Sequence, residues 1–315
     1  MNIPDLQKLA LRTRSTREAG ITLLLASAVL ALFLLISPVV KRTPSAAVTI
    51  HNPSAPNAFA NVSIEAKAAV VYDIATRKIL YAKNAEAQLP LASLTKLLTV
   101  YAALKELSPN TPITIPESAA GVYPPHAFTV GQVLPLADLA RLTLTGSLND
   151  GAIAIANATA IQENKTVTAM LAGAAGALDL SQTYALNGSG LDVNTVISGG
   201  YGSAADLARL AGALFERAPN IVSATTHHTA HYVLANGTSF TIKNTDPIVS
   251  TIPRLLLSKT GYTDLAGGNL ALVFDVGMGH PIAVIVLGST LKSRFTDGAA
   301  LVDATLAHFA GIASL

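Results

Sequence analysis

Three short segments of the chain contain side chains that together could perform nucleophilic catalysis. Ser93 and Lys96 are three positions apart at the start of a helical pattern, which places both on one helix face. A serine hydroxyl is a weak nucleophile unless a base removes its proton, and a lysine does so only when it is neutral. Burial and a second cation nearby both lower the pKa of a lysine. The spacing therefore predicts a serine nucleophile with a lysine base.

The other two segments supply the remaining polar groups that such chemistry needs. In Ser147-Leu-Asn149, the hydroxyl could pass a proton and the amide could hold a substrate carbonyl. In Lys259-Thr260-Gly261, the lysine offers the second cation and the threonine offers a hydroxyl to an anionic substrate group. The glycine would let a substrate lie against the edge of a strand.

Each segment alone also has a structural explanation that involves no catalysis. The spacing of the first recurs at Ser289–Lys292, and the spacing of the second recurs at Ser108–Asn110. Ser93 and Asn149 are residue types that commonly cap helices, and Lys259 could be a solvated charge. Only the order of the three segments, on a helix, a loop and a strand, distinguishes them from chance matches.

Hydrophobic periodicity predicts the elements that carry these segments. A hairpin is expected at 69–72 and 79–81, helices at 93–107, 134–144, 150–161 and 168–178, strands at 254–258, 269–276 and 281–287, and a last helix at 297–312. A further helix should begin at Ser203, where Ser203 and Asp206 resemble a capping box. Strands at both ends of the domain and helices between them predict an α+β fold, with an antiparallel sheet flanked by helices.

The N-terminal region has a different character from the rest of the chain. Residues 1–19 carry four basic and two acidic side chains, which account for the whole net charge of +2. Residues 20–40 are uncharged and long enough to cross a bilayer, which takes ~20 residues. We expect a cytoplasmic tail at 1–19, a transmembrane anchor at 20–40, a linker at 41–63 and an exported catalytic domain at 64–315. A cleaved signal peptide is the alternative.

Composition excludes several classes of protein. Half of the 315 residues are hydrophobic and 13% are charged, which excludes a disordered chain. The chain has no cysteine, so it contains no disulfide, iron–sulfur cluster or thiol nucleophile. Outside the tail the charges balance, so nucleic acid is not an expected partner. His227 and His231 have i, i+4 spacing, but the segment lacks a helical pattern and no Glu follows His227, so we expect no metal.

Taken together, the segments resemble the low-molecular-weight penicillin-binding proteins, which are serine-type D-alanyl-D-alanine carboxypeptidases. The similar stretches are Ala66–Asp73 and Leu80–Asn84, Pro90–Lys96, Ser147–Asp150, Asn187–Leu191, and Lys259–Thr263 followed by Ala266-Gly267. The resemblance implies the penicillin-recognising serine-enzyme fold, shared with β-lactamases and transpeptidases, in which an antiparallel sheet carries a helical subdomain.

The resemblance also implies a role for each residue of the first two segments. Ser93 would be the nucleophile that becomes acylated, and Lys96 would be its base. Ser147 would relay a proton to the leaving amine, and Asn149 would bind the peptide backbone of the substrate.

The third segment would bind the other end of the substrate. By the same resemblance, Lys259 supplies positive potential, and Thr260 contacts the terminal carboxylate next to Gly261. The backbone N–H groups of Ser93 and Tyr262 would form the oxyanion hole. No cofactor and no metal are implied.

The expected function is that of a membrane-anchored carboxypeptidase of the bacterial cell membrane, with its catalytic domain outside the cytoplasm. Its substrate would be a peptidoglycan stem peptide ending in D-Ala-D-Ala, and β-lactams would inhibit it covalently. A D-Ala-D-Ala endopeptidase, a β-lactamase of the same fold and a non-catalytic module are the alternatives. A class A β-lactamase needs a glutamate in Glu-x-x-Leu-Asn. Neither Glu163 nor Glu216, the only glutamates between Ser147 and Lys259, fits that pattern.

Overall fold

The computed structural model describes residues 21, 23–28, 57–233, 237 and 239–313. The predicted cytoplasmic tail, most of the predicted anchor and the linker up to residue 56 therefore lie outside the described residues. Among the helices that are described, none is long and apolar enough to cross a bilayer. From Asn57 onwards the described residues belong to one compact unit. Phe59, within the predicted linker, is buried against the domain, where its ring stacks near Tyr81 and His308.

A five-stranded antiparallel sheet forms the centre of this unit, in the order β10-β11-β12-β1-β2. Its strands are β1 (Ala68–Asp73), β2 (Lys78–Lys83), β10 (Leu255–Thr263), β11 (Gly267–Asp275) and β12 (Pro281–Ser289). The first two strands and the last three come from opposite ends of the domain, as the hydrophobic pattern predicts. β10 is an edge strand, which leaves one of its sides available to the helical part of the domain.

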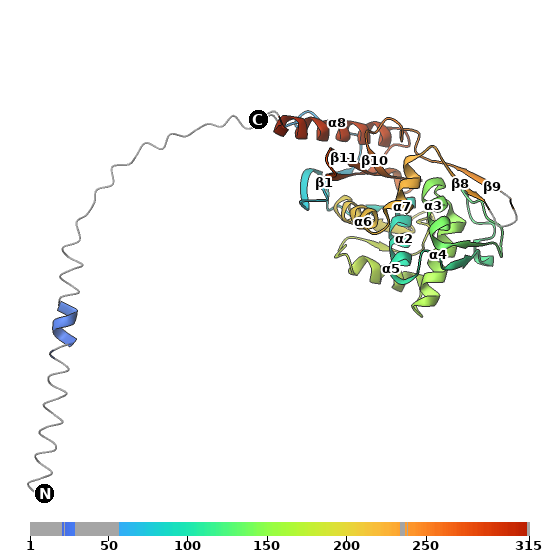
Figure 1. Ribbon diagram of the computed structural model, residues 1–315, viewed down its shortest axis with the longest axis horizontal. Helices are drawn as coiled ribbons and strands as arrows, with labels where there is room; N and C mark the ends of the chain where they lie inside the picture. The colour runs from blue at the N-terminus through green and yellow to red at the C-terminus, as the bar shows by residue number, and fades with distance from the viewer. Residues whose placement is uncertain (1–20, 22, 29–56, 234–236, 238, 314–315) are drawn as a thin grey trace, which may run out of the picture. The chain divides into compact units, whose positions relative to one another are not determined.

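Alternating side chains of the sheet pack into two separate cores. On β11, Ala271 and Val273 face one core while Leu270 and Leu272 face the other. This alternation follows from the two-residue period of a strand, and both faces are apolar because both are covered. The last helix, α8 (Ser293–Ala313), covers one face, and the helical part of the domain covers the other (Figure 1).

The remaining elements form the helical part of the domain and small sheets around it. The helices are α2 (Thr95–Glu106), α3 (Leu136–Gly146), α4 (Asn149–Gln162), α5 (Val167–Gly176), α6 (Ala204–Arg217) and α7 (Pro219–Val222), with 3-10 turns η1 (Ala92–Leu94), η2 (Glu117–Ala119) and η3 (Ser223–Thr226). The short strands are β3 (Leu89–Pro90), β4 (Pro112–Thr114), β5 (Val133–Pro135), β6 (Tyr184–Ala185), β7 (Gly200–Gly202), β8 (Thr229–Val233) and β9 (Ser239–Lys243). The expected helices are all present, with ends that differ by a few residues.

Two boundaries differ from the prediction in a way that matters for the site. The pattern predicts a strand at 254–258, whereas β10 continues to Thr263 because its ladder with β11 runs as far as the pair Thr263–Gly267. The helix expected from Ser93 instead begins with the 3-10 turn η1, so Ser93 precedes the first residue of α2.

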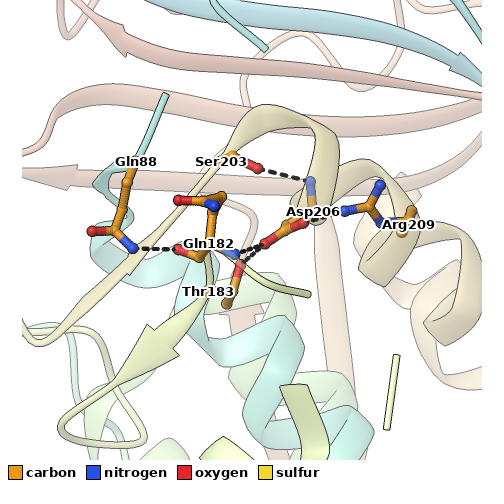
Figure 2. A network of polar contacts seen from close by, with 6 residues as sticks. All are labelled: Gln88, Gln182, Thr183, Ser203, Asp206 and Arg209. Carbon is orange, nitrogen blue, oxygen red and sulfur yellow. Dashed lines mark hydrogen bonds and ion pairs between the residues drawn. The ribbon is translucent and has the colours of Figure 1, made fainter. Parts of the chain in front are cut away.

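A buried carboxylate joins α6 to the segment directly before β6. Ser203 accepts a hydrogen bond from the Asp206 backbone N–H at 3.1 Å, which confirms the predicted cap of α6. The Asp206 carboxylate pairs with Arg209 and accepts hydrogen bonds from Gln182 N and the Thr183 hydroxyl (Figure 2). Asp206 is fully buried, and all of its partners are polar, so its charge is compensated within the fold.

Candidate active site

Two glycines leave room for an unusual backbone conformation around Ser93. Ala92, immediately before the serine, has φ +48°, a left-handed conformation that is strained for a residue with a side chain. A Cβ on Gly190 would overlap the Ala92 carbonyl oxygen, and a Cβ on Gly261 would lie 2.9 Å from Leu91 O. The absence of a side chain at Gly261 therefore lets β10 pack against the serine turn, a reason that the sequence alone did not indicate.

Lys96, in the first turn of α2, makes three polar contacts. Its Nζ lies 2.6 Å from Ser93 Oγ, 2.7 Å from Asn149 Oδ1 and 2.8 Å from the Ser189 carbonyl oxygen. The side chain is completely buried. Burial disfavours the charged ammonium and lowers the pKa of Lys96 to about 7, although the Asp150 carboxylate opposes part of that shift. Both protonation states of Lys96 are therefore accessible near neutral pH.

The contacts of Lys96 determine which atom can accept the serine proton. A neutral amine has two N–H groups and one lone pair, and the amide oxygen of Asn149 and the carbonyl oxygen of Ser189 can only accept. When Lys96 is neutral, its two N–H groups donate to those oxygens, and its lone pair faces the Ser93 hydroxyl. Neutral Lys96 is therefore oriented to accept the proton of the Ser93 hydroxyl, as a general base must.

Asn149 and Asp150 fasten the start of α4 to the loop at 121–128. The Asn149 side chain donates to Tyr123 O at 2.8 Å while its oxygen accepts from Lys96, which leaves one amide hydrogen for a substrate. The buried Asp150 carboxylate accepts from the backbone N–H groups of Ala127 and Phe128, each at 2.7 Å. These bonds compensate the carboxylate charge and hold the loop near Lys96.

Ser147 and Lys259 form a second serine–lysine pair. Ser147 ends α3 with φ +57°, just before α4, and its Oγ accepts a hydrogen bond from Lys259 Nζ at 2.8 Å. Lys259 also donates to Thr260 O at 2.7 Å and is buried. Burial, together with the positive charges of Lys96 and Arg294, holds the pKa of Lys259 well below its usual range.

Sequence reasoning missed three groups that surround these pairs. Arg294, at the start of α8, donates to Gly261 O at 2.7 Å and adds a cation close to Lys259. Lys96 donates to the backbone carbonyl oxygen of Ser189, and any residue type at position 189 would offer this oxygen, so the sequence does not reveal the contact. Asp246 accepts a hydrogen bond from the Ser258 hydroxyl at 2.5 Å and lies in a segment for which no element was predicted.

The structure thus places the predicted site residues in two connected groups. Ser93, Lys96 and Asn149 meet at the lysine amine. Ser147 and Lys259 are in contact, and Thr260 and Gly261 continue along β10 past the serine turn. Tyr262 follows on the same strand, with a side chain that is 47% exposed.

His227 and His231 are not arranged as a metal site. His231 lies on β8, where its two ring nitrogens contact the hydroxyls of Thr229 and Thr241. His227 precedes that strand, so the two side chains do not share a helix face. Within the described ranges, no group of three or more histidines, aspartates and glutamates could hold a metal ion.

The fold and this site are those expected of a serine enzyme of the acyl-transfer type, with a buried lysine in contact with the serine hydroxyl. Residues 52–290 match the peptidase S11 family, which is described as D-alanyl-D-alanine carboxypeptidase. The chain belongs to this family.

Three relatives illustrate the match. The D-alanyl-D-alanine carboxypeptidase DacF of Bacillus subtilis (strain 168) is 27% identical over 269 residues, which cover 81% of this chain and 68% of the relative. A D-alanyl-D-alanine endopeptidase of Pseudomonas aeruginosa is 29% identical over 242 residues, 74% of each chain. The structure of penicillin-binding protein D2 from Listeria monocytogenes with cefotaxime superimposes with a TM-score of 0.65 at 26% identity, covering 78% of this chain and 98% of that one.

Proposed function

We propose that the protein removes the terminal D-alanine from peptidoglycan stem peptides through an acyl-enzyme on Ser93. The observation that carries the mechanism is the buried Lys96 amine, 2.6 Å from Ser93 Oγ, with a pKa lowered to about 7. The family is that of D-alanyl-D-alanine carboxypeptidases, so the reaction class agrees with the geometry.

In the acylation step, neutral Lys96 takes the Ser93 proton while the serine oxygen attacks the carbonyl carbon between the two D-alanines. Backbone N–H groups of Ser93 and Tyr262 stabilise the resulting oxyanion, and donors of this kind contribute roughly 3–4 kcal/mol each. Ser147, held by Lys259, passes a proton to the leaving amine of D-alanine. Asn149 binds the peptide backbone, Thr260 binds the terminal carboxylate, and Lys259 supplies positive potential. Water then hydrolyses the ester on Ser93.

β-Lactams fit the same site as covalent inhibitors, and the ligand-bound relative supports this proposal. Rapid release of the drug would need a base placed to activate water. Glu163 instead pairs with Lys165 at the end of α4, and Glu216 lies in the last turn of α6. We therefore expect a long-lived acyl-enzyme rather than β-lactamase activity.

D-Alanine release from a stem pentapeptide, measured beside hydrolysis of a chromogenic β-lactam, tests these assignments. We expect multiple turnovers of the peptide and about one equivalent of β-lactam consumed. Rapid turnover of the β-lactam without D-alanine release would instead identify a β-lactamase.

A second candidate is an endopeptidase that cuts crosslinked peptides, because one relative has that name. The same residues would perform both reactions, so only the products separate them. Cleavage of a crosslinked dimer without release of terminal D-alanine would favour the endopeptidase.

We also propose that residues 20–40 anchor the protein in the bacterial cell membrane, with residues 1–19 in the cytoplasm and the catalytic domain outside. The uncharged run and the basic tail before it support this proposal. Mass spectrometry of the membrane fraction should find the catalytic domain still joined to residues 1–19. A soluble form beginning between residues 41 and 61 would show that the segment is a cleaved signal peptide.

A further inference from the structure

A hydroxyl outside the predicted motifs contacts the threonine that would bind the substrate carboxylate. Thr245 Oγ1 lies 2.6 Å from Thr260 Oγ1, and either atom could be the donor. Thr260 is buried on β10, whereas Thr245 is half-buried in the segment that follows β9. The two threonines are 15 positions apart, so the contact arises from the fold and not from local spacing.

The position of Thr245 is fixed by the polar groups around it. Its backbone N–H donates to Thr145 O, in α3, at 3.2 Å. The preceding residue, Asn244, donates from its side chain to Thr225 O at 2.8 Å and accepts from Asp246 N at 2.9 Å. Asn244 and Asp246 are both buried. A side chain on such a restrained backbone loses little further freedom when it holds a hydrogen bond.

Counting protons gives the contact a direction when substrate is bound. Each threonine hydroxyl has a single hydrogen, and a carboxylate can only accept. If Thr260 donated to Thr245, it would present only lone pairs to the substrate. If Thr245 donates to Thr260, the Thr260 hydrogen is free to point at the carboxylate. The second arrangement is the one that binds an anion.

Resting on the function proposed above, we propose that Thr245 is a positioning residue that orients the Thr260 hydroxyl toward the terminal carboxylate of the substrate. The hydrogen bonds then run from Thr245 to Thr260 to the carboxylate. Thr245 acts through Thr260 and so favours peptides with a free C-terminal carboxylate over peptides without one.

The test is Thr245→Val, which removes the hydroxyl and keeps the branched shape. For a stem peptide with a free carboxylate, kcat/KM should fall about tenfold, mainly through KM, because a hydrogen bond to a charged group is weakened. For the same peptide with a C-terminal amide, the change should be less than about twofold, and Thr245→Ser should restore the activity. Thr251→Val, at an exposed threonine of the same segment, is the matched control and should behave like wild type.

A double mutant distinguishes positioning from support of the fold. If Thr245 acts through Thr260, Thr245→Val should add almost nothing once Thr260→Val is present. Fully additive losses, or equal losses with the carboxylate and amide peptides, would overturn the proposal. A Thr245→Val enzyme with wild-type kinetics would overturn it as well.

Thermal unfolding of each variant shows whether the fold is intact. Failure of the proposed function would look different, since the wild-type enzyme itself would neither release D-alanine nor react with labelled penicillin.

Discussion

The site contains two serine–lysine pairs that look alike and differ in their surroundings. Ser93 and Lys96 are 2.6 Å apart, Ser147 and Lys259 are 2.8 Å apart, and both lysines are buried. The first pair comes from one turn of helix. The second joins residues 112 positions apart in the sequence.

Their electrostatic environments separate the two pairs. Lys96 has an anion nearby, because the Asp150 carboxylate favours its charged form. Lys259 has two cations nearby, Lys96 and Arg294, which oppose its charge and outweigh the opposite effect of the Asp246 carboxylate. In the proposed mechanism Lys96 accepts the proton, because Asn149 and Ser189 engage its two N–H groups and its lone pair faces Ser93, whereas Lys259 donates to Ser147. The neighbours decide the role, and the motif does not.

The largest expected effect is the loss of the nucleophile from the first pair. Ser93→Ala should abolish covalent labelling by a fluorescent penicillin, because Ser147 contacts a lysine but is not placed to be acylated. Ser289→Ala is the control, since Ser289 shares the Ser-x-x-Lys spacing but donates to Asp297 at 2.7 Å. That variant should label normally and lose about 1 kcal/mol of stability. Normal labelling of Ser93→Ala would refute the assignment.

The next largest effect should come from arginine substitutions, which distinguish the roles of the two lysines. Arginine keeps the positive charge but cannot be deprotonated in a protein. Lys96→Arg should therefore slow acylation by about a thousandfold, because general-base catalysis is lost. Lys259→Arg keeps a donor beside Ser147 and should slow it by only about tenfold. Stopped-flow labelling measures both rates, and equal losses would mean that both lysines act as bases or neither does.

The pH dependence of acylation should follow Lys96. The pKa of Lys96 is lowered to about 7, and the neutral form is the base, so the base is lost as the pH falls. The acylation rate should be level above that value and fall about tenfold for each pH unit below it. A flat profile across the neutral range would show that Lys96 does not take the proton.

The smallest effect should come from the Asp150 carboxylate, which acts on Lys96. Asp150→Asn removes a charge that favours the protonated form of Lys96, so the pKa of Lys96 should fall further and activity should extend to lower pH. The midpoint of the profile should move down by about half a unit. An upward shift, in a variant whose thermal unfolding shows it to be folded, would contradict this electrostatic description.

Local parts of the site could be predicted from the sequence, because helix geometry fixes them. The i, i+3 spacing of Ser93 and Lys96 determines their proximity, and the Ser203 cap follows from its residue type. The order of strands at both ends of the domain with helices between them likewise predicted the antiparallel sheet. These features depend on neighbours in the chain and on the periods of helices and strands.

The parts that could not be predicted depend on tertiary contacts. Arg294 on α8, Thr245 after β9 and the Ser189 carbonyl between β6 and β7 reach the site through contacts between segments far apart in the sequence. The end of β10 at Thr263 was missed for a related reason, since its length is set by pairing with β11. The segments at 20–40 that would fix the location of the enzyme lie mostly outside the described residues.

The attachment of the first strand gives the domain a particular resistance to force. The Asp297 carboxylate, on α8, accepts the backbone N–H groups of Glu65 and Ala66 at 3.0 and 2.9 Å. The strand that follows, β1, is paired along both edges, with β12 and β2. Tension applied to the chain before Glu65 must first break the bonds to Asp297 and then shear β1 past two neighbours at once. A domain pulled from its N-terminal end would therefore resist until β1 separates from β12 and β2.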